Sequence, residues 1–219
     1  MDYNRIYEYR FRNVSKEKKL TVWKEISEYI FKRLGSPQRI LDPAAGECEF
    51  INSISSKEKW ALDINGDFLS KHAAGDVTVK VGNCLHSDLP GNYFDAVFIS
   101  NFLEHLDKPD DIDTLLSRMF VTLKTGGKIA IMGPNFKYCM KEYFNFADHK
   151  LILTESSLEE YLYSAGFEIV SVIPRFIPYS FQSRLPVNKL IVRGYLAFPF
   201  LWKFFGKQFL LFAEKKVVI

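Results

Sequence analysis

The fold of this chain is decided by residues 40–50, which read ILDPAAGECEF. An apolar strand over 39–42 ends in Asp42 and runs into a turn of small residues, which opens a helix over 49–54. Small side chains let a ligand approach the backbone, and the first turn of a helix offers free N–H groups. Taken alone, the turn is equally well explained as a tight connection between a strand and a helix.

Two later strand ends carry polar residues at informative positions. The strand over 60–63 ends in Asp63, 21 positions after Asp42. A carboxylate about 20 residues beyond such a turn is the usual partner of ribose hydroxyls, so Asp63 predicts a nucleoside without a 2′-phosphate. After the strand over 77–81, Asn83 and the backbone at Cys84 could bind an adenine edge, although Asn83 suits a turn equally well.

Strands and helices alternate along the rest of the chain. The sequence predicts strands at 39–42, 60–63, 77–81, 94–100, 127–133, 168–172 and 208–213, and helices at 16–34, 49–54, 67–73, 112–123 and 156–165. Apolar runs such as AVFIS and KIAIM suit strands that are buried on both faces. We therefore expect a doubly wound α/β fold with a mostly parallel, seven-stranded sheet.

We expect a single domain over 1–219, with a helical region at 1–36, a cofactor-binding core at 37–175, an aromatic insertion at 176–207, and a last strand with its tail at 208–219. The side chains of Tyr3, Tyr7, Tyr9, Arg10 and Phe11 form either a lid or a plain packing helix. The aromatic insertion could supply extra core with a homodimer face, a wall for a bulky or lipid-linked acceptor, or a peripheral membrane contact. Its prolines disfavour the membrane reading.

Composition excludes several classes of protein. An apolar content of 47% in 219 residues suits a folded core, and the net charge of +3, from 29 basic and 26 acidic residues, does not indicate nucleic acid. The lysines within 16–19 and 57–59 are typical of a solvated surface. The three cysteines, Cys48, Cys84 and Cys139, lack the spacing of metal ligands, so no metal site is expected. The absence of a signal-peptide pattern predicts a cytoplasmic protein.

The order of the motifs ILDPAAG, ALDIN, GNCL, FDAVFISNFLEHL and LKTGGKIAIMGPN resembles the class I S-adenosylmethionine-dependent methyltransferases. The stretches YRFRNVSKEKKLTVW, NFADHK, PYS and GKQFLLFAEK further resemble an uncharacterised bacterial branch of that family, often found with saccharide-modifying enzymes. The resemblance implies that the cofactor S-adenosylmethionine contacts residues at four strand ends. The methionine part would lie at Asp42, Ala44, Gly46 and Ser100, the ribose at Asp63 beside Ile64, and the adenine at Asn83 and Cys84. Glycines are more common in the family where this chain has Ala44 and Cys48.

The resemblance further implies methyl transfer to oxygen or nitrogen of a small-molecule, saccharide or lipid-linked acceptor. A hydroxyl acceptor needs a general base, for which Glu104, His105 and His149 are candidates, and Asn135 follows the fifth strand on the same side. His149 is preferred as the base because imidazole titrates near neutral pH. For each histidine a structural role is still favoured, namely packing or loop hydrogen bonding for His149 and orientation of the following helix for His105. The alternatives are an NAD-dependent oxidoreductase, which Glu49 at the third glycine position opposes, and a subunit without catalysis.

Overall fold

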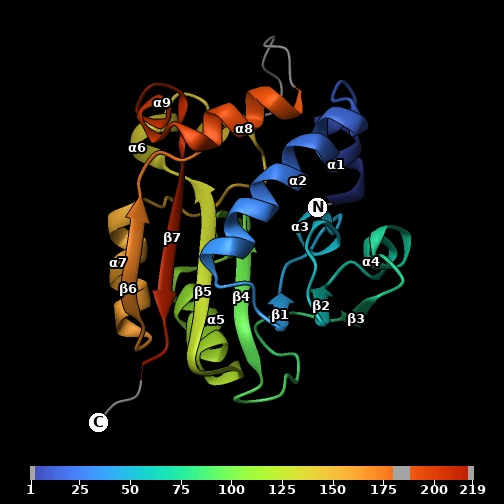
Figure 1. The fold of residues 1–219 in the computed structure, drawn as a ribbon, viewed down its shortest axis with the longest axis vertical. Coiled ribbons are helices and arrows are strands. Elements are labelled where there is room, and N and C mark those ends of the chain that lie inside the picture. The colour runs from blue at the N-terminus through green and yellow to red at the C-terminus, as the bar shows by residue number, and fades with distance from the viewer. Residues whose placement is uncertain (1–2, 180–187, 217–219) are drawn as a thin grey trace.

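The computed structural model describes residues 3–179 and 188–216 (Figure 1). Within these residues, seven strands form one sheet in the order β3-β2-β1-β4-β5-β7-β6. Of these described strands, β7 alone runs in the direction opposite to the others. The strands are β1 (Arg39–Asp42), β2 (Glu58–Asp63), β3 (Val77–Val81), β4 (Phe94–Ser100), β5 (Leu123–Pro134), β6 (Glu168–Ile173) and β7 (Gln208–Glu214). The expected doubly wound, mostly parallel sheet is confirmed.

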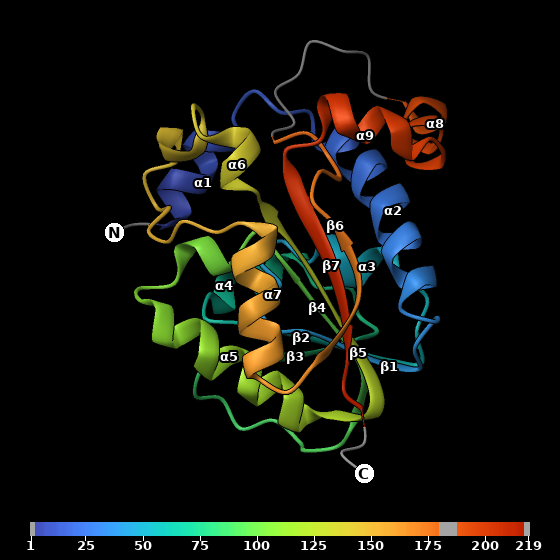
Figure 2. The ribbon, with the colours of Figure 1, turned by 90° about the vertical axis from the view of Figure 1, so that its left-hand side faces the viewer.

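Helices cover both faces of this sheet. In Figure 2, α2 and α3 lie on one side of the strands, and α5 and α7 lie on the other. Two short 3-10 helices, η1 (Leu103–His105) and η2 (Tyr143–Asn145), lie in the loops that follow β4 and β5. The α-helices are α1 (Tyr3–Phe11), α2 (Lys16–Arg33), α3 (Glu49–Ser53), α4 (Gly66–His72), α5 (Pro109–Thr122), α6 (Phe136–Cys139), α7 (Glu155–Ser164), α8 (Lys189–Ala197) and α9 (Pro199–Phe205).

The central strands and α2 form as the apolar pattern dictates. Residues 96–99 of β4 are fully buried, because helices cover the strand on both faces. Helix α2 begins after Ser15, whose side chain accepts a hydrogen bond from the Lys18 amide and so caps the helix. Its buried stripe contains Trp23, Ile26 and Ile30, which recur at helical spacing.

The strand order reverses beside β1, because the chain adds β2 and β3 on one side of it and β4 and β5 on the other. The carboxyl ends of parallel strands diverge at such a reversal, and open α/β sheets bind their ligands there. A ligand site is therefore expected beyond the ends of β1, β2 and β4.

Of the lysines expected on a solvated surface, Lys59 is buried and Lys19 is mostly buried. Lys59 lies in β2 with 5% of its side chain exposed, and its Nζ is 2.7 Å from Oδ2 of Asp76. Lys19 of α2 is 12% exposed and pairs with acids of the loop after β1. The interpretation of these two positions as solvated was wrong, because the aliphatic part of a lysine packs well when its ammonium group finds a carboxylate.

The aromatic insertion combines buried and exposed apolar surface. Helix α8 packs on α2, where Nε of Arg193 donates to Oε2 of Glu25 at 2.6 Å, and Trp202 is buried. Other aromatic side chains of α9 and its preceding residue are more than half exposed, namely Phe198, Phe200, Phe204 and Phe205. Residues 180–187 of the insertion lie outside the described part. Among the residues that are described, no helix has the length and apolar character needed to span a membrane.

Candidate functional site

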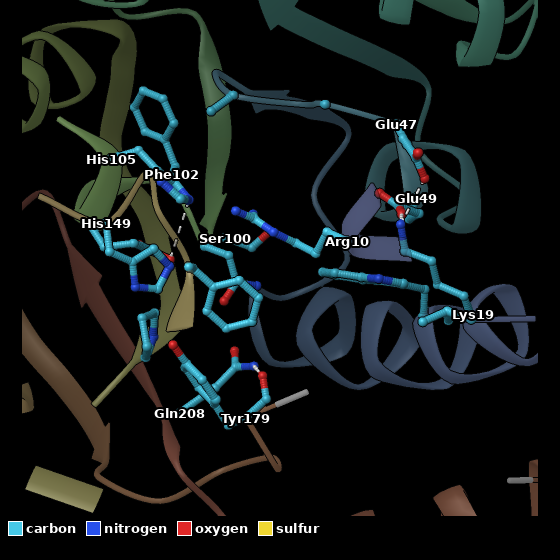
Figure 3. Close-up of a pocket in the computed structure, with 18 residues that line it drawn as sticks. Arg10, Lys19, Glu47, Glu49, Ser100, Phe102, His105, His149, Tyr179 and Gln208 are labelled. Carbon is cyan, nitrogen blue, oxygen red and sulfur yellow. Dashed lines mark hydrogen bonds and ion pairs between the residues drawn. The ribbon is translucent and has the colours of Figure 1, made fainter. Parts of the chain in front are cut away.

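A cavity of about 190 Å³ opens where the carboxyl ends of β1, β4 and β5 meet the start of β7. Ala44 and Gly46 line it from the loop after β1, and Ser100 lines it from the end of β4. Figure 3 shows His105 and His149 on one side of this cavity and Lys19 with two acids on the other. The cavity therefore joins the predicted cofactor loop to the predicted acceptor residues.

The loop after β1 leaves space for a ligand. Gly46 has φ +50°, and a Cβ built on it would meet no atom within 4 Å. Cys48 follows in a left-handed conformation with φ +60° and is fully buried, although non-glycine residues adopt this region infrequently. Burial raises the pKa of the Cys48 thiol to about 12, so the group stays protonated and is no nucleophile.

Asp63 connects the end of β2 to this loop. Its Oδ2 accepts a hydrogen bond from the Gly46 amide at 2.8 Å, and its Oδ1 accepts one from the Asn65 amide, also at 2.8 Å. A carboxylate has about four acceptor positions, so both oxygens keep capacity for ribose hydroxyls. Ile64 follows Asp63 with 73% of its surface exposed, at the position where the resemblance places the ribose.

Buried acids surround the start of the loop. Asp42 is 3% exposed, and its Oδ1 accepts from the Ala44 amide at 3.3 Å. Burial raises the pKa of Asp42 to about 8, and the charges of Asp63 and Glu49 add to this effect. Burial also raises the pKa of Glu49. This excess of carboxylates favours a cationic ligand, such as one with ammonium and sulfonium groups.

Lys19 is a site residue that the sequence did not reveal. Its Nζ is 2.7 Å from Oε2 of Glu47 and also forms an ion pair with Glu49, and all three side chains line the cavity. The sequence did contain a sign that Lys19 is not on the solvated face of the helix. Lys19 lies four residues before Trp23 and seven before Ile26, which places it on the buried stripe of α2. The ion pairs join α2 to the predicted cofactor loop.

The residues predicted to contact adenine lie outside the cavity lining. Oδ1 of Asn83 accepts from the Leu85 amide at 2.8 Å, which gives this side chain the role of closing a turn. Cys84 is buried, and burial raises its pKa to about 12. Adenine binding at Asn83 and Cys84 stays a prediction.

The three predicted acceptor-side residues come together. Glu104 and His105 from η1 and His149 from the loop after η2 all line the cavity. The two segments are joined by hydrogen bonds from the amides of Lys150 and Leu151 to the Glu104 carbonyl, at 2.8 and 3.1 Å. Burial lowers the pKa of His149 to about 4, so its imidazole is neutral at pH 7. Burial raises the pKa of Glu104. Whether any of the three acts as a base stays a prediction.

Helix α1 covers part of the cavity through Arg10. This side chain forms an ion pair with Asp148, and its guanidinium carbon lies 4.6 Å from the centre of the Phe146 ring. Tyr9 is 68% exposed and does not line the cavity. The side chains of the other residues considered for the lid lie outside the described part of the structure, namely Tyr3, Tyr7 and Phe11. Arg10 therefore supports the lid interpretation over a plain packing helix.

Gln208, the first residue of β7, was also missed and lines the cavity beside Tyr179. Its Nε2 donates to the carbonyls of Pro178 and Tyr179 at 3.2 and 3.4 Å, while its buried Oε1 has no hydrogen-bond partner among the described residues. An unpaired buried oxygen is costly, so it indicates a ligand that donates a hydrogen bond. Asn135, predicted on the acceptor side, does not line the cavity: its Nδ2 donates to Glu155 at 2.6 Å and to the Pro174 carbonyl at 2.9 Å. A role for Asn135 on that side stays a prediction.

Residues 41–131 match the family model described as a methyltransferase domain. No curated protein sequence gives a significant match. Among solved structures, a SAM-dependent methyltransferase from Archaeoglobus fulgidus is 25% identical with a TM-score of 0.70, covering 98% of this chain and 100% of the other. The resemblance to class I S-adenosylmethionine-dependent methyltransferases is thereby confirmed.

Two further neighbours share the fold. One is a SAM-dependent methyltransferase from Thermotoga maritima, a possible histamine N-methyltransferase, at 18% identity and TM-score 0.66, covering 97% of this chain and 99% of the other. The other is geranyl diphosphate C-methyltransferase from Streptomyces coelicolor A3(2), solved with S-adenosyl-L-homocysteine, at 13% identity and TM-score 0.63, covering 86% of this chain and 77% of the other. These two neighbours show the fold, while the family-model match and the Archaeoglobus fulgidus structure support S-adenosylmethionine as the cofactor.

Proposed function

We propose that this protein binds S-adenosylmethionine beyond the ends of β1, β2 and β3 and transfers its methyl group to oxygen or nitrogen of a small acceptor in the cavity. The observation that carries this proposal is the continuity of the cavity. It runs from Ala44 and Gly46, in the predicted cofactor loop, past Ser100 to Glu104 and His149. A donor held at one end and an acceptor held at the other would meet near Ser100.

The charges of the loop support this cofactor over a dinucleotide. NAD places a pyrophosphate at the first turn of the helix after β1, where free N–H groups favour anions. Here Glu47 and Glu49 occupy that position, and both line the cavity. Carboxylates repel a pyrophosphate and attract the ammonium and sulfonium groups of S-adenosylmethionine. The oxidoreductase alternative is disfavoured for this reason.

When bound, S-adenosylmethionine supplies a methyl group on a sulfonium, which is already a strong electrophile. The chain then has to hold the acceptor atom in line and to exclude water. Gln208 offers its unpaired Oε1 to a hydroxyl or N–H group of the acceptor. Trp23, Phe102 and Phe146 supply apolar walls, and Arg10 closes the side beneath α1. Loss of an acceptor proton calls for a base, for which Glu104, His105 and His149 remain the candidates.

The lining also bears on the class of acceptor. Among the described residues of the aromatic insertion, Tyr179 lines the cavity. Aromatic walls combined with polar groups suit a small molecule or a saccharide unit, and the exposed face of α9 could hold the apolar part of a lipid-linked acceptor. A homodimer across that same exposed face is the alternative use that we propose for it.

Thermal unfolding of the full chain with S-adenosylhomocysteine or NAD tests the proposal. A ligand that binds only the folded state at 100 times its Kd stabilises the protein by about 2.7 kcal/mol. We expect S-adenosylhomocysteine to raise the melting temperature and NAD to leave it unchanged. Stabilisation by NAD alone would establish the oxidoreductase alternative. No response to either ligand would favour a subunit without catalysis.

A further inference from the structure

We propose that Glu104, His105 and His149 bind a divalent transition-metal ion on the acceptor side of the cavity. Each of the three side chains offers one ligand atom, and these atoms lie within 4.8 Å of one another. Within residues 3–179 and 188–216, no other group of three histidine, cysteine or acidic side chains meets in this way. Two imidazoles and one carboxylate are a ligand set that zinc and iron use in catalytic sites.

The separations between the three ligand atoms are slightly longer than those around a bound zinc ion. Oε1 of Glu104 is 3.9 Å from Nε2 of His105. Two ligand atoms at tetrahedral positions around zinc are separated by about 3.4 Å, given metal–ligand distances near 2.1 Å. Movement of each ligand atom by less than about 1 Å would bring all three to bonding distance from a single zinc ion. Glu104 is 2% exposed, so its carboxylate is already removed from bulk water.

His105 is oriented as a metal ligand usually is. Its Nδ1 lies 3.0 Å from the carbonyl oxygen of Asp148 and 3.5 Å from Oδ2 of the same residue. These two acceptors favour the proton on Nδ1, so Nε2, which lies 3.9 Å from Oε1 of Glu104, keeps its lone pair for a metal ion. A carboxylate behind a ligating histidine fixes its tautomer and increases its basicity. Asp148 is itself held by Arg10 through an ion pair.

His149 supplies an independent observation. Its Nδ1 is buried and has no hydrogen-bond partner among the described residues. The ring of His149 packs edge-on against the ring of His105, with 5.0 Å between their centres. An unpaired nitrogen in a buried site is costly unless a ligand satisfies it, and a metal ion would do so.

Three protein ligands leave at least one coordination position open, as in catalytic rather than structural sites. All three residues line the cavity, so the open position faces the acceptor. The ion would hold an oxygen or nitrogen atom of that acceptor in the cavity. Competing thiols are absent from the lining, because Cys48, Cys84 and Cys139 are buried elsewhere.

Equilibrium dialysis of the untagged, EDTA-treated full chain against Zn²⁺ tests this site. We expect about one tightly bound zinc per chain. His149→Gln and Glu104→Gln should each lower the affinity at least tenfold, whereas His86→Gln, at an exposed histidine, should bind like the natural protein. Asp148→Asn keeps every ligand and should weaken binding by roughly 10- to 100-fold. Equal affinity in all variants, or no bound zinc, would overturn the proposal.

A second measurement needs no variant. The chain has four histidines, so paramagnetic Co²⁺ should broaden the NMR signals of two imidazoles, His105 and His149, and leave His72 and His86 sharp. Broadening of all four signals, or of neither cavity histidine, would contradict the site. Both measurements are made without S-adenosylhomocysteine, so their failure leaves the proposed methyl transfer untouched. A response to Mg²⁺ but not to Zn²⁺ or Co²⁺ would also argue against imidazole ligands, because magnesium prefers oxygen.

Discussion

Replacing Asp42 by Asn should stabilise the ligand-free protein at alkaline pH. Burial raises the pKa of Asp42 to about 8 in the folded chain, against an ordinary value of 3.8 that applies when the chain is unfolded. Between these two values the folded state binds more protons than the unfolded state. The free energy of unfolding therefore falls as the pH rises from about 4 to about 8, and levels off above that. An amide in place of the carboxyl removes this dependence.

The size of the effect follows from the same pKa. Between the two pKa values, only the folded state keeps the proton on Asp42. Each pH unit in this range lowers the free energy of unfolding by about 1.4 kcal/mol. From pH 5 to pH 8, the stability of Asp42→Asn relative to the natural protein should thus increase by up to about 4 kcal/mol. The amide oxygen of Asn can still accept the hydrogen bond from the Ala44 amide, so the turn is kept.

Urea unfolding at pH 5 and pH 8 measures this difference. Asp88→Asn is the control, because it removes one carboxylate from an exposed position. If the free energy of unfolding changes equally with pH in Asp42→Asn and in the natural protein, Asp42 ionises like an exposed acid, and the prediction is refuted. Above pH 8, where Asp42 of the natural protein is ionised, the same variant should bind S-adenosylhomocysteine at least about tenfold more weakly, because hydrogen bonds to a charged group are roughly twice as strong as neutral ones. A variant that is more stable and binds less well is expected of a site residue.

Asp63→Asn leaves one acceptor oxygen, which can serve either the Gly46 amide or the Asn65 amide but not both. It should weaken S-adenosylhomocysteine binding at least about tenfold, measured by titration calorimetry, and a Kd equal to that of Asp88→Asn would remove Asp63 from the ribose site. Lys19→Gln should lower the free energy of unfolding by roughly 1–3 kcal/mol, because Glu49 loses its cation in a mostly buried position. Exposed Lys18→Gln is the matched control in urea unfolding, and an equal effect of both changes would contradict the role assigned to Lys19.

Much of the fold could be predicted because a strand that is buried on both faces is a continuous run of apolar residues in the sequence. β1, β3 and β4 begin and end at the predicted residues. β1 and β4 contain buried apolar runs, whereas the edge strand β3 alternates valines with polar residues. The other strands differ at their ends; β5, for example, begins four residues before the predicted 127. Helix α6 escaped prediction because a single turn has no periodicity to detect. Helices α8 and α9 divide the aromatic insertion at Phe198, where the following proline starts a new helix.

Site residues could be predicted only where a single stretch of sequence identifies them, as polar residues do at the end of a predicted strand. Asp42 and Asp63 follow from strand ends at a fixed spacing, and Glu104 and His105 from the end of β4. Gln208 could not be found, because its role depends on β7 lying beside β5. The pairing of Arg10 with Asp148 joins residues 138 positions apart, and such a contact is set by the packing of whole elements.

A crystal structure of the full chain with S-adenosylhomocysteine tests the central claim most directly. We predict the ribose hydroxyls within hydrogen-bond distance of Asp63, and the sulfur at the mouth of the cavity between Gly46 and Ser100. The amino acid end of the ligand should lie among the acids around Asp42. Binding at another place on the protein, or a ribose directed away from Asp63, would contradict the assignment of this edge of the sheet as the cofactor site.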